Sequence, residues 1–250
     1  MNTAIKLHII FTIFGNLCAN PPAEIPEELY KEFTLNGIIS LQYRYFNNTI
    51  NQPRIYTKEN VNQLIQKVSK KEIFYYEETN KWIYEALDKY SIKNLTVAIM
   101  GSTKPYCEAI CLYYQGIPVT IEYNKIISED PRITCLTVDE FDTNPFHVDA
   151  AFSISSFEHD GLGRYGDPID PFGDIKAMKK MKKIIKKDGI LFLSIPVGKD
   201  TLVWNATRIY GRIRLPMILD DWIVIDSFGF TTNLFTKNGY IQPVFVLKNK

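Results

Sequence analysis

The fold of this 250-residue chain is decided around TVAIMG at residues 96–101, a short apolar run that ends in a glycine. A run of about four to eight apolar or β-branched residues, bounded by turn residues, is typical of a strand buried on both faces. Similar runs follow at residues 118–123, 133–138, 148–155 and 190–195. Because helical or turn segments separate these runs, the pattern predicts an α/β domain with a mostly parallel sheet.

Apolar residues recur at helical spacing before the first strand and between the later ones. Helices are expected at residues 57–70, 77–90, 106–114 and 174–187. In the last of these, Asp174 is predicted to cap the start, and Asp188-Gly189 to end the helix.

The chain closes with two further apolar runs, at residues 222–228 and 243–248, which predict a terminal antiparallel pair. Together the elements predict the fold class as α/β. We expect a Rossmann-like, doubly wound mixed sheet that is mostly parallel and has a C-terminal antiparallel hairpin.

The composition is that of a folded domain with no global charge. Hydrophobic residues make up 46% of the chain, and the formal net charge is +1. This suffices to bury one core, and it offers no field that would attract nucleic acid or a membrane surface. Seven lysines in residues 174–187 are interpreted as the solvated outer face of a helix.

Residues 1–19 are typical of a signal peptide. Lys6 precedes an apolar run over residues 7–19, which is too short to span a bilayer and stops at Asn20-Pro21-Pro22. Cleavage after Ala19 would direct the chain to the secretory pathway. The alternative is a buried N-terminal strand or helix and a cytoplasmic location. No transmembrane helix is expected.

The rest of the chain divides into an irregular N-terminal extension at residues 20–56 and the α/β domain at residues 57–250. Three sequons, at Asn47, Asn94 and Asn205, make the chain a candidate glycoprotein, although this composition produces about two by chance. Outside the predicted signal peptide the chain has three cysteines, Cys107, Cys111 and Cys135. We expect them to be small buried hydrophobic residues. The alternative is a single disulfide between Cys135 and one of the other two.

A nucleotide-type cofactor would bind at the carboxyl ends of the first strands. Gly101 permits close approach of a ligand, and Ser102 offers a hydroxyl. Glu122 follows Gly101 by twenty-one residues, a distance that suits hydrogen bonds to both hydroxyls of an adenosine ribose. Asp139, after the third strand, is a candidate for the adenine amino group. An ordinary strand-to-helix turn and solvated loop acids are the alternatives.

The most reactive side chains follow the fourth strand, at residues 158–167. His159 is predicted to accept a substrate proton, with Glu158 or Asp160 orienting its ring. Alternatively, Glu158 pairs with Arg164 and His159 only caps the loop. A metal site formed by Glu158, His159, Asp160 and Asp167 lacks diagnostic spacing.

Arginines near the same edge are candidates for binding an anionic substrate. Arg164 lies in the loop after the fourth strand, while Arg208, Arg212 and Arg214 follow the fifth. Surface ion pairs that anchor a loop are the alternative reading.

Three motifs carry a resemblance to a known family. They are SFEHDGLGRYGDP at residues 156–168, PVGKD at 196–200 and RIYGRIRLP at 208–216. The chain closely resembles, over roughly residues 60–250, the uncharacterised nematode-rich family called domain of unknown function 268.

That family is similar to class I S-adenosylmethionine-dependent methyltransferases. The resemblance implies that Gly101 is the first-strand glycine, Glu122 the ribose-binding acid, and Phe157 part of the cofactor-binding segment after strand four. Methyltransferases usually carry several glycines in the first loop, whereas this loop keeps only Gly101 and is stiffened by Pro105.

The function expected from these features is S-adenosylmethionine-dependent methyl transfer to a small-molecule or protein acceptor. Two alternatives stay open. One is a methyltransferase-like domain that has lost catalysis and binds a partner. The other is another transferase that uses a nucleotide or sugar donor.

Overall fold

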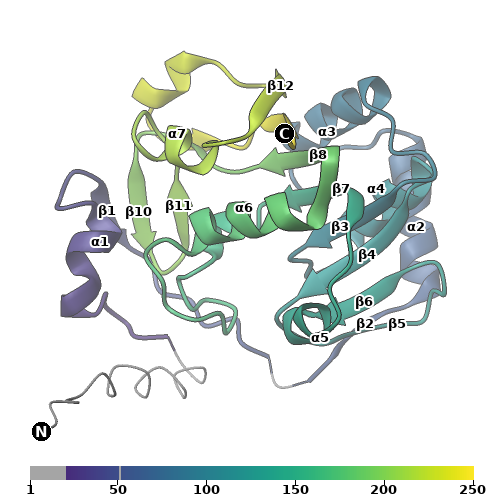
Figure 1. Cartoon of the computed structure of the whole chain (residues 1–250), viewed down its shortest axis with the longest axis horizontal. Helices are drawn as coiled ribbons and strands as arrows, with labels where there is room; N and C mark the ends of the chain where they lie inside the picture. The colour runs from purple at the N-terminus through teal and green to yellow at the C-terminus, as the bar shows by residue number, and fades with distance from the viewer. Residues whose placement is uncertain (1–20, 51) are drawn as a thin grey trace, which may run out of the picture.

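The computed structural model describes residues 21–50 and 52–250. The predicted signal peptide lies outside the described residues. A seven-stranded sheet in the order β12-β14-β8-β7-β3-β4-β6 forms the centre of the molecule (Figure 1). Its strands are β3 (Thr96–Met100), β4 (Ile117–Glu122), β6 (Thr134–Thr137), β7 (Val148–Ile154), β8 (Ile185–Ser194), β12 (Ile223–Phe228) and β14 (Val244–Lys248).

The sheet is mixed, as predicted. The pairs β3-β4, β3-β7, β4-β6 and β7-β8 are parallel, whereas β14 is antiparallel to both β8 and β12. The fold class is therefore confirmed, and the terminal antiparallel pair is present. It does not simply extend the sheet edge, because the last strand inserts between β8 and β12.

Helices cover both faces of the sheet, which is why the strands are continuously apolar. On one face Val97 and Ile99 of β3 pack with α2 (Lys58–Ser69), α3 (Glu78–Lys89) and α4 (Tyr106–Tyr113). On the other, Ala98 packs with α5 (Val138–Thr143), α6 (Gly173–Ile184) and α7 (Arg214–Ile218). Alternate residues of one strand thus supply two separate cores.

The N-terminal extension is more ordered than the sequence suggests. It contains a 3-10 helix (Glu27–Leu29), α1 (Tyr30–Thr34) and two strands, β1 (Ser40–Tyr43) and β2 (Arg54–Tyr56). Strand β1 pairs in parallel with β10 (Thr201–Trp204), which pairs with β11 (Thr207–Ile209). The extension is therefore bound to the segment after β8.

Small elements complete the chain around the main sheet. Strand β2 pairs with β5 (Ile126–Ser128), and β9 (Val197–Gly198) pairs with β13 (Tyr240–Ile241). Two further 3-10 helices span Phe157–His159 and Thr232–Thr236. Such short pieces lack the length that makes periodicity visible in a sequence.

Helix α6 corrects the prediction made for residues 174–187. It ends at Ile184, and β8 begins at the next residue, so Asp188-Gly189 falls within a strand. Asp174 does not cap the helix. Its carboxylate is buried and binds Arg214 Nη2 at 2.6 Å, Arg214 Nε at 2.9 Å and the Tyr210 hydroxyl at 2.9 Å.

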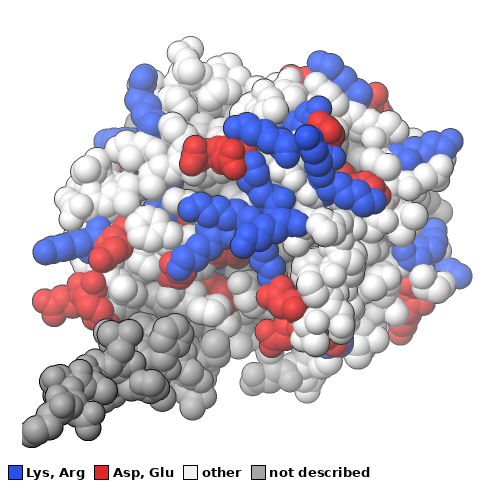
Figure 2. Space-filling view, in the orientation of Figure 1, with Lys and Arg blue, Asp and Glu red and all other residues white. Residues whose placement is uncertain are grey.

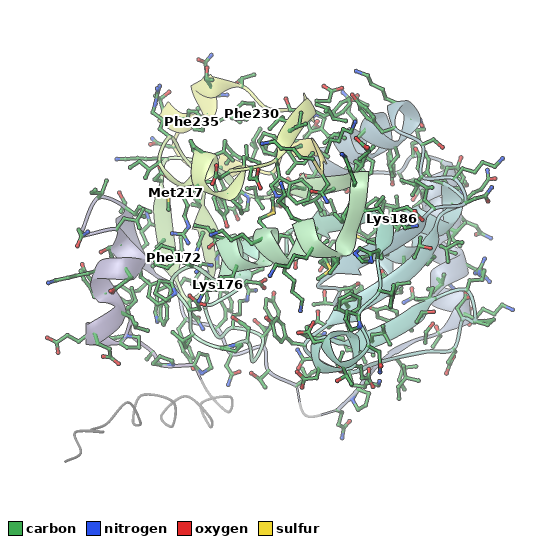
Figure 3. The ribbon with its side chains drawn as sticks, viewed as in Figure 1. Phe172, Lys176, Lys186, Met217, Phe230 and Phe235 are labelled. Atoms are coloured by element: carbon green, nitrogen blue, oxygen red, sulfur yellow. The ribbon has the colours of Figure 1, made fainter. Side chains whose placement is uncertain are left out.

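The lysines of α6 and its surroundings lie on the surface, as expected. Lys and Arg side chains gather over α6 on the face drawn in Figure 2. Lys176 pairs with Asp170, and Lys186, just after the helix, lies 2.6 Å from Asp149 (Figure 3). Surface pairs of this kind contribute little to stability.

The structure bears on two of the expected secretory features, the disulfide and one of the sequons. The three cysteines of the described residues are free thiols, so the alternative bridge to Cys135 does not form there. Asn205 is fully buried, and its amide exchanges two hydrogen bonds with the Phe46 backbone. Its sequon is therefore inaccessible in the folded chain. Within residues 21–50 and 52–250, no helix has the length and apolarity to cross a bilayer.

Substitution of Asp174 should test the buried ion pair. Asp174→Asn should lower the free energy of unfolding by roughly 3–5 kcal/mol, because it leaves buried guanidinium charge uncompensated. The control Asp142→Asn, in a half-exposed pair with Lys180, should cost roughly 0–1 kcal/mol. Urea unfolding measures both, and equal losses would contradict the assigned role of Asp174.

Candidate functional site

A cleft of about 600 Å³ opens at the carboxyl ends of the central strands. Residues that directly follow β3, β4, β7 and β8 line it, and α6 forms part of its wall. The strand order reverses at β3, with β4 and β6 on one side and β7 and β8 on the other. Ligands of open α/β sheets bind at such switch points. The cleft is therefore the candidate site.

Gly101 brings the loop after β3 against the loop after β7. Its φ is +66°, and a Cβ at this position would lie 2.3 Å from Ser156 Oγ. A side chain here would face both a strained backbone and a steric clash. Glycine is thus required for this close approach in the cleft wall.

Glu122 lies at the carboxyl end of β4, almost completely buried. Its Oε2 accepts a hydrogen bond from the Ser102 N–H at 2.9 Å, and its Oε1 accepts one from the Asn124 N–H at 3.2 Å. Burial raises the pKa of Glu122, while the Asn124 N–H and the nearby Arg54 oppose that shift. Each carboxylate oxygen can accept a further hydrogen bond from a ligand.

Ser102 lies behind the cleft wall instead of lining it. Its Oγ accepts a hydrogen bond from the buried Tyr56 hydroxyl at 2.9 Å and donates to the Lys104 carbonyl at 3.0 Å. Through its N–H, Ser102 orients Glu122. Its hydroxyl is therefore a support for the loop.

Glu158 sits in a buried polar network after β7. Its Oε1 accepts hydrogen bonds from Ser155 Oγ at 2.8 Å and from Gln242 Nε2 at 3.2 Å, and Gln242 also donates to Ser155 Oγ. Its Oε2 is buried and has no hydrogen-bond partner within the described part of the chain. Burial raises the pKa of Glu158 to about 7, although Ser155 works against that shift.

His159 is held in one tautomer. Its Nδ1 lies 2.8 Å from the Ala206 carbonyl oxygen, which can only accept, so Nδ1 carries the proton and Nε2 the lone pair. Nε2 is 3.7 Å from Glu158 Oε1, too far for a hydrogen bond. Burial, helped by the charge of Arg164, lowers the pKa of His159 to about 3. The imidazole is neutral at physiological pH.

The loop between Glu158 and α6 is organised by one buried arginine and one aspartate. Arg208 donates to four backbone carbonyls, those of Glu158, Asp160, Asp170 and Pro171. The Asp167 carboxylate accepts from the N–H groups of Gly161, Gly163 and Tyr165. The hydrogen bonds of Arg208 and Asp167 therefore fix the backbone of this loop, which forms part of the cleft wall.

The structure brings together most of the predicted site residues. Those that line the cleft are Gly101, Glu122, Phe157, Glu158, His159, Asp160, Arg164 and Asp167. Asp139 is exposed in the first turn of α5 and does not line the cleft. Arg208 is buried beneath the loop, while Arg212 is exposed beside Phe235, so neither lines the cleft.

The two parts of the alternative reading of the loop have different outcomes. Glu158 and Arg164 form no ion pair among the described residues, whereas the His159 ring does bind a backbone carbonyl, that of Ala206, as a residue that caps the loop would. In residues 21–50 and 52–250, no group of His, Cys, Asp and Glu side chains is arranged to hold a metal ion.

The residues that line the cleft without having been predicted include Arg44, Phe46, Ser155 and Gln242. Ser155 ends a predicted strand, and a search of strand ends would have found it. Arg44 and Phe46 alternate with tyrosines in residues 43–46, a strand-like signal within a segment that otherwise reads as irregular. Gln242 carries no local signal, because only the insertion of β14 brings it to Glu158.

The architecture matches that of solved methyltransferases. The 1,6-didemethyltoxoflavin N1-methyltransferase of Burkholderia thailandensis, solved with 1,6-didemethyltoxoflavin and S-adenosylhomocysteine, aligns with a TM-score of 0.51 and 14% identity, over 84% of this chain and 99% of that one. An S-adenosylmethionine-dependent methyltransferase of Clostridium acetobutylicum aligns with a TM-score of 0.47 and 11% identity, over 76% and 98%. The first of these alignments shows that the chain has a methyltransferase-type fold.

Within that fold, the sequence has a defined family. The profile of the family described as Caenorhabditis protein of unknown function, DUF268, matches residues 94–237, more than half of the chain. The chain belongs to this family, as the three motifs predicted. A comparison with curated protein sequences gives no significant match.

The buried state of Glu158 should be visible in the pH dependence of stability. Its pKa is about 7 in the fold and roughly 4.3 when unfolded, so between these pH values the folded chain holds a proton that the unfolded chain has lost, and stability falls as pH rises. Between about pH 4.5 and 7, the wild type should lose on the order of 3 kcal/mol relative to Glu158→Gln. Urea unfolding across this range measures the difference.

The control for this series is Asp139→Asn, at an exposed position. Because this variant keeps Glu158, it should show the loss of stability between pH 4.5 and 7 that the wild type shows. A constant difference between Glu158→Gln and the wild type from pH 4.5 to 8 would show that Glu158 titrates normally.

Proposed function

We propose that this protein is an S-adenosylmethionine-dependent methyltransferase whose acceptor is a small molecule or a protein. The observation that carries the proposal is the position of Glu122, a buried carboxylate at the carboxyl end of β4, joined through Ser102 to the tight turn at Gly101. In Rossmann-like sheets, an acid at this place meets the ribose of an adenosine ligand. The methyltransferase-type fold supports the same reading.

The cleft residues fit the adenosine part of such a cofactor. Gly101 lets the loop after β7 pack closely against the end of β3, and the Glu122 oxygens retain lone pairs for two ribose hydroxyls. Phe157 adds a buried apolar wall. Asp139 has no part in this proposal, because it lies outside the cleft. When bound, S-adenosylmethionine would supply an electrophilic methyl group.

For this chain's own residues, we infer that Glu158 accepts the proton that the acceptor loses. General-base catalysis works best when the pKa of the base lies near the working pH. The pKa of Glu158 is raised by burial to about 7, whereas burial lowers the pKa of His159 to about 3. Glu158 Oε2 also has no partner within the described chain. His159, with Nδ1–H bound to Ala206, would instead accept a hydrogen bond through Nε2.

Cofactor binding should depend on Glu122. Because hydrogen bonds to a charged group are worth about 1.5–3 kcal/mol, Glu122→Ala should weaken binding of S-adenosylmethionine roughly ten- to a hundredfold. The control is Asp139→Asn, which should bind like the wild type. Calorimetry measures all three affinities. A folded wild type that binds no cofactor would favour the non-catalytic binding module.

Turnover should depend on Glu158 while cofactor affinity does not. Glu158→Gln keeps the shape and the hydrogen-bond acceptor at Oε1 but removes the base, so methyl transfer should fall roughly 10²–10⁴-fold. The rate of the wild type should rise with pH and level off above about 7, following the pKa of Glu158. Transfer of labelled methyl groups to acceptors found in a compound and protein screen measures both.

The matched control is Glu108→Gln. Glu108 is equally buried, and burial likewise raises its pKa to about 7, but it lies outside the cleft. It should keep full turnover. If Glu158→Gln stays active while His159→Gln does not, the base is the histidine.

A further inference from the structure

We propose that the cleft holds an oxyanion, a carboxylate or a phosphate of the acceptor, between the guanidinium groups of Arg44 and Arg164. The identification of the bound molecule as the methyl acceptor rests on the proposed methyltransferase function. Anion binding itself does not, because it needs no methyl donor. The site joins the N-terminal extension, which supplies Arg44, to the loop after β7, which supplies Arg164. Both residues line the cleft.

The two guanidinium groups are placed by one aromatic ring. The Arg164 guanidinium carbon lies 4.4 Å from the centre of the Phe46 ring, and that of Arg44 lies 5.0 Å from the same centre. An arginine that packs on an aromatic face keeps its N–H donors in a fixed plane, free to bind an anion at the edge. Phe46 thus brings two cations to the same part of the cleft.

The Phe46 segment is anchored in the fold. The buried amide of Asn205 accepts from the Phe46 N–H at 2.8 Å and donates to the Phe46 carbonyl at 2.9 Å. Asn48 and Arg164 also bind each other twice, since the Asn48 N–H donates to the Arg164 carbonyl and Arg164 Nε donates to Asn48 Oδ1. The site is therefore preorganised.

The positive charge of this pair is not neutralised by the protein. Among the described residues, neither Arg44 nor Arg164 forms an ion pair, whereas Arg132, Arg208 and Arg214 each pair with a carboxylate. Arg164 donates from Nε to Asn48 and from Nη1 to the Ala206 carbonyl, and its Nη2 forms no hydrogen bond within residues 21–50 and 52–250. A guanidinium with free N–H groups matches the geometry of a carboxylate or phosphate.

Two acids of the same cleft, Asp160 and Asp167, form no ion pair with Arg44 or Arg164 in the described part of the chain. Burial raises the pKa of Asp160 well above its usual range, and the nearby Asp167 adds to the shift. The Asp167 carboxylate is already occupied by three backbone N–H groups. Neither of these two acids therefore neutralises the pair; the cleft acid on which the charge of Arg164 acts is Glu158, whose raised pKa it opposes.

The site also lies next to the proposed proton acceptor. One carbonyl oxygen, that of Ala206, accepts hydrogen bonds from both Arg164 Nη1 and His159 Nδ1, each at 2.8 Å. His159 in turn is the neighbour of Glu158, at 3.7 Å. An anionic group bound by Arg164 would thus lie close to Glu158. A single small acceptor molecule could therefore contact both residues at once.

Anion binding can be measured without any acceptor. Thermal-shift titrations of the full chain with inorganic phosphate and, separately, with benzoate, at constant ionic strength set by chloride, give apparent affinities. We expect at least one anion to bind the wild type, and Arg164→Gln and Arg44→Gln each to weaken it roughly tenfold or more. A response to inorganic phosphate would identify the bound group as a phosphate, and a response to benzoate would identify it as a carboxylate.

Arg212→Gln is the matched control, because Arg212 is an exposed arginine that also packs on a phenylalanine but lies outside the cleft. It should bind the anion like the wild type. Arg44→Gln changes an exposed side chain, which keeps the test valid if Arg164→Gln folds poorly.

Two results would overturn the proposal: no response of the wild type to either anion, or equal losses in Arg212→Gln and in both cleft variants. The same titrations with S-adenosylmethionine separate this inference from the proposed function. Anion binding without cofactor binding would reject the methyltransferase alone, and the reverse would reject the anion site alone.

Discussion

The buried carboxylate of Asp174 is the interaction on which the cleft depends. It binds Arg214 through two hydrogen bonds and lies 3.8 Å from Arg208 Nε, so one acid compensates two buried guanidinium groups. Arg208 in turn holds four backbone carbonyls of the loop before α6. Burial alone would raise the pKa of Asp174, but Arg208 and Arg214 outweigh it and hold that pKa below its usual range. The cluster thus stays ionised and fixes the loop that carries Glu158 and His159.

The central sheet could be predicted from the sequence because its inner strands are buried on both faces. Thr96–Met100 and its neighbours read as apolar runs for that reason, and each was located within a few residues except β8, which begins five residues early. The insertion of β14 could not be predicted, since strand order depends on long-range pairing. Asp174 was misread as a helix cap because an acid at the start of a helix looks the same in sequence whether it faces solvent or a buried arginine.

The candidate site shows a similar division. Strand ends pointed to Gly101, Glu122 and the loop at Glu158, because polar residues after buried strands meet at one edge of the sheet. Their protonation states could not be read from the chain. Burial, which only the packed structure reveals, makes His159 a weak base and brings the pKa of Glu158 to about 7. The contribution of Arg44 and Phe46 needed the pairing of β1 with β10, a contact between distant segments.

Binding of S-adenosylmethionine in the cleft at Gly101 and Glu122, as proposed above, can be tested by a thermal-shift screen of the purified protein. The screen compares S-adenosylmethionine and S-adenosylhomocysteine with nicotinamide dinucleotides and nucleotide sugars. A ligand at a hundred times its dissociation constant stabilises a fold by about 2.7 kcal/mol. If the cleft binds S-adenosylmethionine, the melting temperature should rise with the first two compounds only. A rise in melting temperature with a nucleotide sugar or a dinucleotide would contradict binding of S-adenosylmethionine in the cleft. So would the absence of a rise with any of the compounds.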